Sequence, residues 1–273
     1  MSLIRKPAAA GYFYPADASK LKAEIDVLLS ISEKREIPGK LFGIVSPHAG
    51  YIYSGKTAAF GYNLFKGKNI KHVIILSPSH REYFPGISVY EGDAYQTPLG
   101  IVPVNKKMAE SLTGQSKTIF MGEEGHRDEH AIEVQVPFLQ TVLDDFDIVP
   151  VVMGDQGKLF IDELAEKITN SIDESTVIVS SSDLSHYYKA DAADRMDSIV
   201  ERDISNFNYE GLFDNFEAGT CEACGAGTII AMMKSADKLN YHNSMVLYRN
   251  NSGDTTGDKR EVVGYLSAAV YGD

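Results

Sequence analysis

Three histidines each end a short apolar run, and this placement is the first sign of chemistry in the sequence. His48 ends the run LFGIVSPH, His80 ends HVIILSPSH and His186 ends STVIVSSSDLSH. In open α/β sheets, ligands bind at the carboxyl ends of the strands, where the loops converge. Because adjacent strands lie about 4.8 Å apart, the imidazoles of His48 and His80 could reach one ion. The pattern alone is compatible both with a shared metal site and with two structural histidines.

His186 and Asp183 belong to the third run and have more than one interpretation. A role for His186 as an acid, a base or a hydrogen-bond partner of a substrate requires it to face the same cleft as the other two histidines. Asp183 either orients a histidine through a hydrogen bond or caps the helix that follows. Capping is the commoner role of an aspartate in such a turn, so we expect a cap at Asp183.

The segment GHRDEHAIEVQ places His126 and His130 four residues apart, a spacing that brings two side chains to one face of a helix. A zinc-protease helix has a glutamate directly after the first histidine, where Arg127 stands in this chain. Gly125 also indicates that the helix begins near Asp128, which leaves His126 outside it. We therefore expect His130 to be structural or to line a pocket, and we set a metalloprotease site aside.

Cys221 and Cys224 are the only cysteines of the chain and form a C-x-x-C motif. In a thioredoxin-like site this motif follows a strand, but residues 213–220 have no clear strand pattern. A zinc knuckle requires a second such pair or histidines that complete it. Cys224 precedes an expected helix whose positive end favours a thiolate, although Glu222 opposes this effect. We expect Cys221 to act as a small buried hydrophobic residue.

The elements that position these side chains alternate between short apolar runs and longer helical stretches. Strands are predicted at residues 41–48, 72–80, 146–153, 175–186, 244–250 and 260–271. Helices are predicted at residues 20–31, 57–64, 104–112, 130–143, 159–172, 193–206 and 225–239, with Pro137 as a kink. This alternation indicates an α/β fold with a central mixed, mostly parallel sheet that helices flank on both faces. The last two strands are candidates for an antiparallel hairpin.

Composition narrows the classes of function. The 273 residues carry a formal net charge of −12, which disfavours a nucleic-acid partner because it repels phosphate backbones. The N-terminus lacks the apolar stretch of a secretory signal, and no run of about 18 apolar residues could span a membrane. Two cysteines rule out a disulfide framework, so we expect a cytoplasmic protein. Because no repeat or long linker interrupts the chain, the sequence predicts one domain over residues 1–273.

Seven motifs occur in the order GYFYP, SPHAGYIYSG, LSPSH, QTPLG, DEHAIEVQVPFL, SSSDLSH and CGAG. Together they resemble the Memo family, whose bacterial and archaeal members are also called AmmeMemoRadiSam system protein B, over nearly the whole chain. The resemblance implies a fold shared with the class III extradiol ring-cleaving dioxygenases, which hold Fe(II) with two histidines and one glutamate. It further implies that His48, His80 and Cys224 are metal ligands, that His186 is the additional catalytic histidine and that His130 lines the pocket.

One ligand departs from the dioxygenase pattern, because Cys224 stands where those enzymes have a carboxylate. A thiolate makes the site softer, which suits copper(I) or zinc while the site can still hold iron. It also makes the ligand itself oxidisable. We expect Fe(II) as the cofactor, with copper or zinc as alternatives. The resemblance therefore extends to the fold and the pocket, but not to catechol cleavage.

Three functions remain open at this stage. The first is a metal-dependent redox or oxygenase-type enzyme in which His186 and His130 move protons or position an unknown aromatic or phenolic small molecule. The second is a non-catalytic module that binds a peptide or small ligand in a groove lined by Tyr12, Tyr14, Tyr51 and Tyr53. The third is a zinc hydrolase, although nothing in the sequence indicates a scissile substrate. The family context also suggests functional association with a radical-SAM protein.

Overall fold

The computed structural model describes residues 3–33 and 35–273 of the chain. Residues 1, 2 and 34 of the predicted domain lie outside the described residues, and the extent of that domain stays a prediction. No helix in the described ranges is both long enough and apolar enough to cross a membrane.

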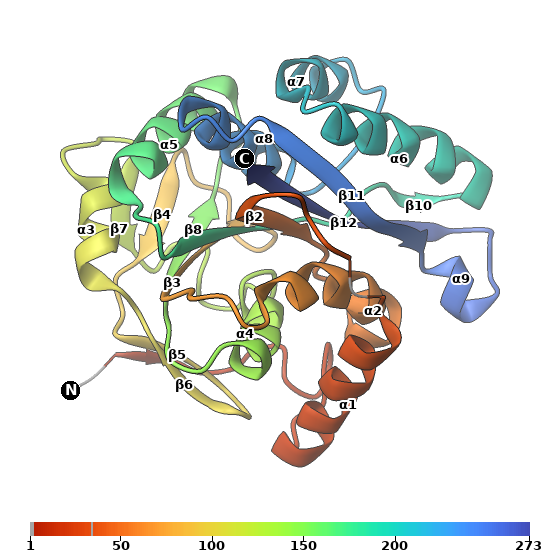
Figure 1. Ribbon diagram of the computed structural model, residues 1–273, viewed down its shortest axis with the longest axis horizontal. Coiled ribbons are helices and arrows are strands. Elements are labelled where there is room, and N and C mark those ends of the chain that lie inside the picture. The colour runs from red at the N-terminus through yellow and green to blue at the C-terminus, as the bar shows by residue number, and fades with distance from the viewer. Residues whose placement is uncertain (1–2, 34) are drawn as a thin grey trace.

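A mixed sheet runs through the middle of the molecule (Figure 1). Within the described chain it has nine strands in the order β10-β12-β2-β9-β3-β8-β4-β7, and β11 also pairs with β12. The central strands β2, β9, β3 and β8 are parallel, whereas β12 and β4 run antiparallel to their neighbours β2 and β8. The bounds are β2 (Lys40–Ser46), β3 (His72–Pro78), β4 (Ile87–Tyr90), β7 (Ile119–Gly122), β8 (Asp147–Met153), β9 (Thr176–Ser181), β10 (His186–Tyr188), β11 (Asn243–Asn251) and β12 (Val262–Gly272).

Helices cover both faces of this sheet. Side chains alternate between the two faces along each strand. In β3, Val73 and Ile75 therefore join one hydrophobic core while Ile74 and Leu76 join the other. The first core packs against α1 (Ala18–Ile31), α2 (Tyr51–Tyr62) and α4 (Val136–Val142). The second packs against α3 (Lys106–Thr113), α5 (Lys158–Ser171), α6 (Ala190–Ser205), α7 (Tyr209–Glu217) and α8 (Ala226–Lys238). The predicted α/β class and the helix-flanked mixed sheet are confirmed.

The remaining elements are short. β1 (Ile4–Arg5), β5 (Ala94–Thr97) and β6 (Gly100–Pro103) form a separate three-stranded sheet. Single turns of helix occur at η1 (Asn63–Phe65), η2 (Glu133–Gln135) and α9 (Gly253–Thr256). The predicted antiparallel pairing of the last two long strands is confirmed, since β11 pairs with β12 and α9 lies in their connection.

Two helix predictions were wrong in their bounds. The helix expected over residues 130–143 consists of η2 and α4, so His130 precedes all helical residues in that segment. Pro137 lies in the first turn of α4 and makes no kink, because a proline there forfeits no intrahelical hydrogen bond. The helix expected from residue 57 begins earlier, at Tyr51, directly after Gly50. The short strands β4 to β7 were missed, because four residues carry too little alternation to be recognised.

A buried carboxylate anchors the N-terminal segment beside η2. Glu133 is fully buried and forms a 2.6 Å ion pair with Arg5. It also accepts hydrogen bonds from the Tyr14 hydroxyl at 2.5 Å and from the backbone N–H groups of Ala8 and Ala9 at 2.7 and 2.8 Å. A buried charge is tolerated only when it is paired and its lone pairs are satisfied. Glu133 meets both conditions and thereby joins the first residues of the chain to the segment that carries His130.

We expect Arg5→Met to lower the free energy of unfolding by about 3–5 kcal/mol, because the Glu133 charge would stay buried without its cation. Urea unfolding followed by circular dichroism measures this loss. The control is Lys22→Met, which removes an ion pair with Asp26 whose two side chains are about half exposed and should cost under about 1 kcal/mol. Equal losses in the two variants would contradict a structural role for the buried pair.

Candidate metal centre

Three parallel strands end at the same edge of the sheet and bring the candidate residues together. His48 follows the last residue of β2 by two positions, and His80 follows the last residue of β3 by two. Asp183 stands in the same relation to β9, the strand that lies between β2 and β3. Cys224 arrives from another direction, in the loop between α7 and α8.

The ligating atoms of His48, His80 and Cys224 all lie within 4.8 Å of one another. The Sγ atom of Cys224 is 3.1 Å from Nε2 of His48, and the two imidazole rings are 5.0 Å apart with an angle of 77° between their planes. Zn–N and Zn–S bonds are about 2.0–2.3 Å long, so donor atoms around one ion lie at separations of this order. The chain thus brings together the three side chains that the family resemblance names, while their role as ligands stays a prediction.

Hydrogen bonds fix the tautomer of His48. Its Nδ1 lies 2.9 Å from the hydroxyl oxygen of Ser181. That hydroxyl donates to the carbonyl oxygen of Ala131 and accepts from the side-chain amide of Gln135. The Ser181 proton is therefore engaged, and Nδ1 of His48 must be the donor in their contact. This leaves the lone pair of Nε2 directed at Cys224, and burial, with a smaller contribution from His80, holds the pKa of His48 well below its usual value.

Glu129 orients His80 in the same way. Oε1 of this buried carboxylate is 2.9 Å from Nδ1 of His80, and Oε2 accepts the backbone N–H of His80 at 2.6 Å. The backbone N–H groups of His130 and Ala131 donate to Oε1 as well. Burial alone would raise the pKa of Glu129, but the hydrogen bonds and charge of His80 lower it to about 2. An ionised carboxylate that accepts the Nδ1 proton of a histidine leaves Nε2 free for an ion. Metal-binding histidines usually have a partner of this kind.

Glu129 also belongs to a second group of donor atoms, with His80 and His130, whose members lie within 4.8 Å of one another. The oxygens of Glu129 already accept three backbone N–H groups besides the imidazole of His80. We therefore assign Glu129 to the support of His80 and not to direct coordination, since an ion would have to displace these donors.

Cys224 is protonated in the metal-free site. Burial raises the pKa of its thiol far above the ordinary value, and the nearby Asp183 carboxylate raises it further. A backbone N–H from Asp183 donates to Sγ at 3.2 Å but does not outweigh burial. The stabilisation of a thiolate that we expected from the start of α8 is thus weaker than the effect of burial on the thiol. An ion that binds here must replace the thiol proton.

Asp183 does not cap a helix, so that prediction was wrong. The next helix, α6, begins at Ala190 after Lys189. The Asp183 carboxylate is buried and accepts the backbone N–H of His48 at 2.7 Å. It therefore holds the loop that carries His48, which is closer to the orienting role that the sequence left open.

A cavity of about 700 Å³ opens in front of these residues, and both His130 and His186 line it. The ring of His130 stacks on Phe13 with centroids 4.4 Å apart, and it lies 4.9 Å from the ring of His80. Burial, with a smaller contribution from His48, lowers the pKa of His130 to about 4, so its imidazole is neutral at pH 7. Its buried Nδ1 makes no hydrogen bond in the described chain, although Oε1 of Glu129 lies 3.2 Å away. Both histidines predicted to take part in catalysis thus face the same space.

Most of the other candidates from the sequence lie outside this cavity. His126 is buried away from the cavity lining, and its Nδ1 contacts the Tyr95 hydroxyl at 2.9 Å, so the metalloprotease pair does not form. Cys221 is buried in the second core, as expected. Of the four tyrosines proposed for a groove, Tyr53 lines the cavity, Tyr14 and Tyr51 are buried, and Tyr12 is exposed.

Sequence reasoning missed the residues that orient the candidate ligands. Ser181, Gln135 and Glu129 make the decisive hydrogen bonds, yet none of them stands beside the histidine that it serves. Glu129 gave one signal, an acidic residue inside the DEHAIEVQVPFL motif. The serine run at residues 180–182 gave another, since small polar residues at the end of a buried strand need partners.

Comparisons with known proteins agree with the resemblance of the motifs. A family model described as Memo-like protein matches residues 5–269. A MEMO1 family protein of Thermoplasma volcanium is 38% identical over 266 residues, which cover 97% of this chain and 97% of that protein. A MEMO1 family protein of Thermotoga petrophila is 37% identical over 281 residues and covers 98% and 99% of the two chains.

A solved structure shares the fold. The crystal structure of an uncharacterized protein from Escherichia coli K12 matches with a TM-score of 0.50 at 13% sequence identity. The match covers 74% of this chain and 87% of that chain. At this identity the likeness concerns the α/β architecture alone.

We expect both thiols of the metal-free protein to react slowly with iodoacetamide at pH 8. Burial raises the pKa of Cys221 to about 11 and also raises that of Cys224, and only a thiolate reacts. The rate should increase about tenfold per pH unit between pH 8 and pH 10, since each unit multiplies the thiolate fraction by ten below the pKa. Mass spectrometry of alkylated peptides, with urea-unfolded protein as the control, measures both rates. A rate for Cys224 that already levels off at pH 7 would show a thiolate and contradict this assignment.

Proposed function

The chain belongs to the Memo family, and on that premise we propose that it is a metal-dependent oxidoreductase that binds one ion through His48, His80 and Cys224. The main support is that both imidazoles are held in the tautomer that presents Nε2 to a common point, next to the sulfur. Two unrelated sets of hydrogen bonds produce the same tautomer, which buried structural histidines would not require.

The donor set fits a redox-active ion. Two imidazoles and one softer thiolate can hold iron(II), which we propose first because of the family resemblance, and they also suit copper or zinc. A bound iron or copper ion would supply one-electron chemistry with dioxygen. Three protein ligands leave further positions for small molecules, and the cavity in front of them has room for such a ligand.

Two histidines would move protons in this cavity. His130 is neutral at pH 7 and can accept a proton, and the Glu129 carboxylate, 3.2 Å from its Nδ1, would stabilise the imidazolium that forms. His186, on β10, would serve as a second acid or base, because it lines the same space from another wall. Phe13 keeps the His130 ring in place by stacking on it.

We also propose, from the family context alone, that the protein associates functionally with a radical-SAM protein.

We expect Glu129→Gln to weaken metal binding about 10- to 100-fold although all three ligands remain, because the amide cannot supply the negative charge that supports His80. Competition with a chromophoric chelator for cobalt(II) or zinc measures the affinity. The matched control is Glu163→Gln, since the carboxylate of Glu163 binds Ser116 and Thr118 and serves no histidine. An unchanged affinity in Glu129→Gln would remove Glu129 from the site.

We expect the protein to bind one iron or copper ion per chain under anaerobic conditions and then to consume oxygen when ascorbate supplies electrons. His48→Ala and Cys224→Ser should lose most of the bound metal and of the oxygen uptake. Metal analysis and an oxygen electrode give the two readouts, and zinc-loaded protein is the redox-inert control. Tight metal binding without oxygen uptake would favour the alternative of a ligand-binding module that keeps the pocket. Uptake that is equal in wild type and both variants would contradict the site itself.

A further inference from the structure

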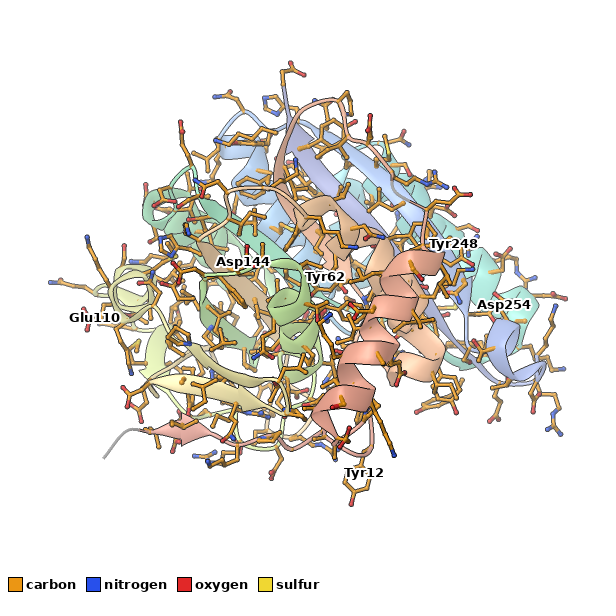
Figure 2. All side chains as sticks on the ribbon, turned by 60° about the horizontal axis from the view of Figure 1, so that its bottom comes forward. Tyr12, Tyr62, Glu110, Asp144, Tyr248 and Asp254 are labelled. Carbon is orange, nitrogen blue, oxygen red and sulfur yellow. The ribbon has the colours of Figure 1, made fainter. Side chains whose placement is uncertain are left out.

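Tyr62 is a buried tyrosine that the proposed chemistry does not use. It is the last residue of α2, its side chain is fully buried, and it lies near the middle of the molecule (Figure 2). Its ring stacks on Phe138 of α4 with centroids 4.9 Å apart and meets Phe65 edge-on at 5.6 Å. Packing on two sides fixes the ring and thereby the position of its hydroxyl group. Because a buried hydroxyl needs a partner, the bond that it makes shows what the residue holds.

The partner of Tyr62 is the side-chain amide of Gln135, which is also buried. The Tyr62 hydroxyl donates to Oε1 of Gln135 at 2.7 Å. Burial raises the pKa of Tyr62 well above its usual value, so the hydroxyl keeps the proton that it donates. Nε2 of Gln135 donates to the carbonyl oxygen of Pro47 at 3.0 Å and to the hydroxyl oxygen of Ser181 at 2.8 Å. The amide therefore has a partner at its oxygen and at both of its N–H groups.

These bonds leave the Gln135 amide one favourable orientation. The carbonyl oxygen of Pro47 can only accept a hydrogen bond, so the nitrogen of the amide must face it. An amide turned over would place its own oxygen against that carbonyl oxygen and leave both without a donor. Tyr62 stabilises the observed orientation, because it donates to the amide oxygen that faces away from Pro47.

Gln135 joins the ends of β2 and β9 just beyond their ladder. The pairing of these two strands ends at Ser46 and Ser181, and the amide then bridges Pro47 and Ser181. Pro47 directly precedes His48, and Ser181 accepts the Nδ1 proton of His48. A single amide thus holds both the backbone before the imidazole and the hydrogen-bond partner of the imidazole.

Helix α2 connects the two ends of this arrangement. It begins at Tyr51, three residues after His48, and it ends at Tyr62 after 12 residues. The hydroxyl of Tyr62 returns through Gln135 to the loop from which the helix starts. Because a packed helix moves as a unit, the bond at its last residue resists displacement of the loop before its first.

We propose that Tyr62 is a positioning residue for His48, which it holds in place through the amide of Gln135. Tyr62 does not line the cavity, so it acts on the site only through this chain of hydrogen bonds. As a statement about metal binding, the inference rests on the proposed function. As a statement about the bond between His48 and Ser181, it can be tested in the metal-free protein.

Tyr62→Phe is the direct test, because it keeps the packed ring and removes only the hydroxyl. In the metal-free variant we expect the Nδ1 proton of His48 to exchange with water about fivefold faster, which corresponds to the net strength of one ordinary hydrogen bond. NMR of ¹⁵N-labelled protein measures this exchange. We also expect cobalt(II) to bind about tenfold more weakly in competition with a chromophoric chelator, at the lower end of the effects known for residues behind metal-binding histidines.

Two further variants separate positioning from packing. Tyr51→Phe removes an equally buried hydroxyl from the same helix, and that hydroxyl donates to the backbone carbonyl oxygen of Val134 at 2.6 Å. It should change neither the exchange nor the affinity. Gln135→Met should show both effects at least as strongly as Tyr62→Phe. Combining Gln135→Met with Tyr62→Phe should add nothing, since the two residues act as one unit.

The exchange of the His48 proton decides the inference. A rate in Tyr62→Phe equal to that of wild type would overturn it, and so would equal acceleration in Tyr51→Phe or additive effects in the double variant. A loss of stability in urea without faster exchange would show that Tyr62 only packs. Failure of the proposed function is a separate result, because it would show as absent metal binding in wild type while the exchange rates keep their order.

Discussion

The parallel pairing of β2 with β9 and of β9 with β3 is the constraint on which the candidate site depends. Ser46 pairs with Ser181 and Leu76 with Ser180, so the three strands end nearly level and their loops leave from one edge. Backbone hydrogen bonds set the spacing between strands, and a register shift of one residue would turn every side chain to the other face. The sheet thus fixes the separation of the two histidine loops before any side-chain interaction contributes.

Buried carboxylates then convert this approximate placement into a defined geometry. Glu129 and Glu133 are both almost fully buried and lie four residues apart, with Glu133 as the first residue of η2. Arg5 bonds the carboxylate of Glu133 and the backbone carbonyl oxygen of Glu129, so a single guanidinium spans the two. Desolvation of such charges is costly unless each is fully paired, and a partly satisfied network would be worse than an apolar core. At one end of this network Glu129 holds the imidazole of His80. At the other end Glu133 holds Arg5 and with it strand β1.

The sequence predicted more of the fold than of the site. Strands β2, β3, β8 and β9 were recognisable because parallel strands in a buried sheet are continuous apolar runs. The convergence of His48 and His80 followed from the shared position of strand ends, which is a property of topology. Cys224 was different, because only the family resemblance connected it to the histidines, and no local pattern places that loop beside β2. The hydrogen bond from His48 to Ser181 spans 133 residues, and no rule of spacing reaches that far.

Burial sets the protonation of the two histidines and of the thiol in the candidate site for one physical reason. Burial lowers the pKa of His48 and His130 and raises that of Cys224, because desolvation disfavours the charged form whatever its sign. These groups are therefore neutral in the metal-free protein, and a divalent ion exchanges for the thiol proton, which costs less as the pH rises.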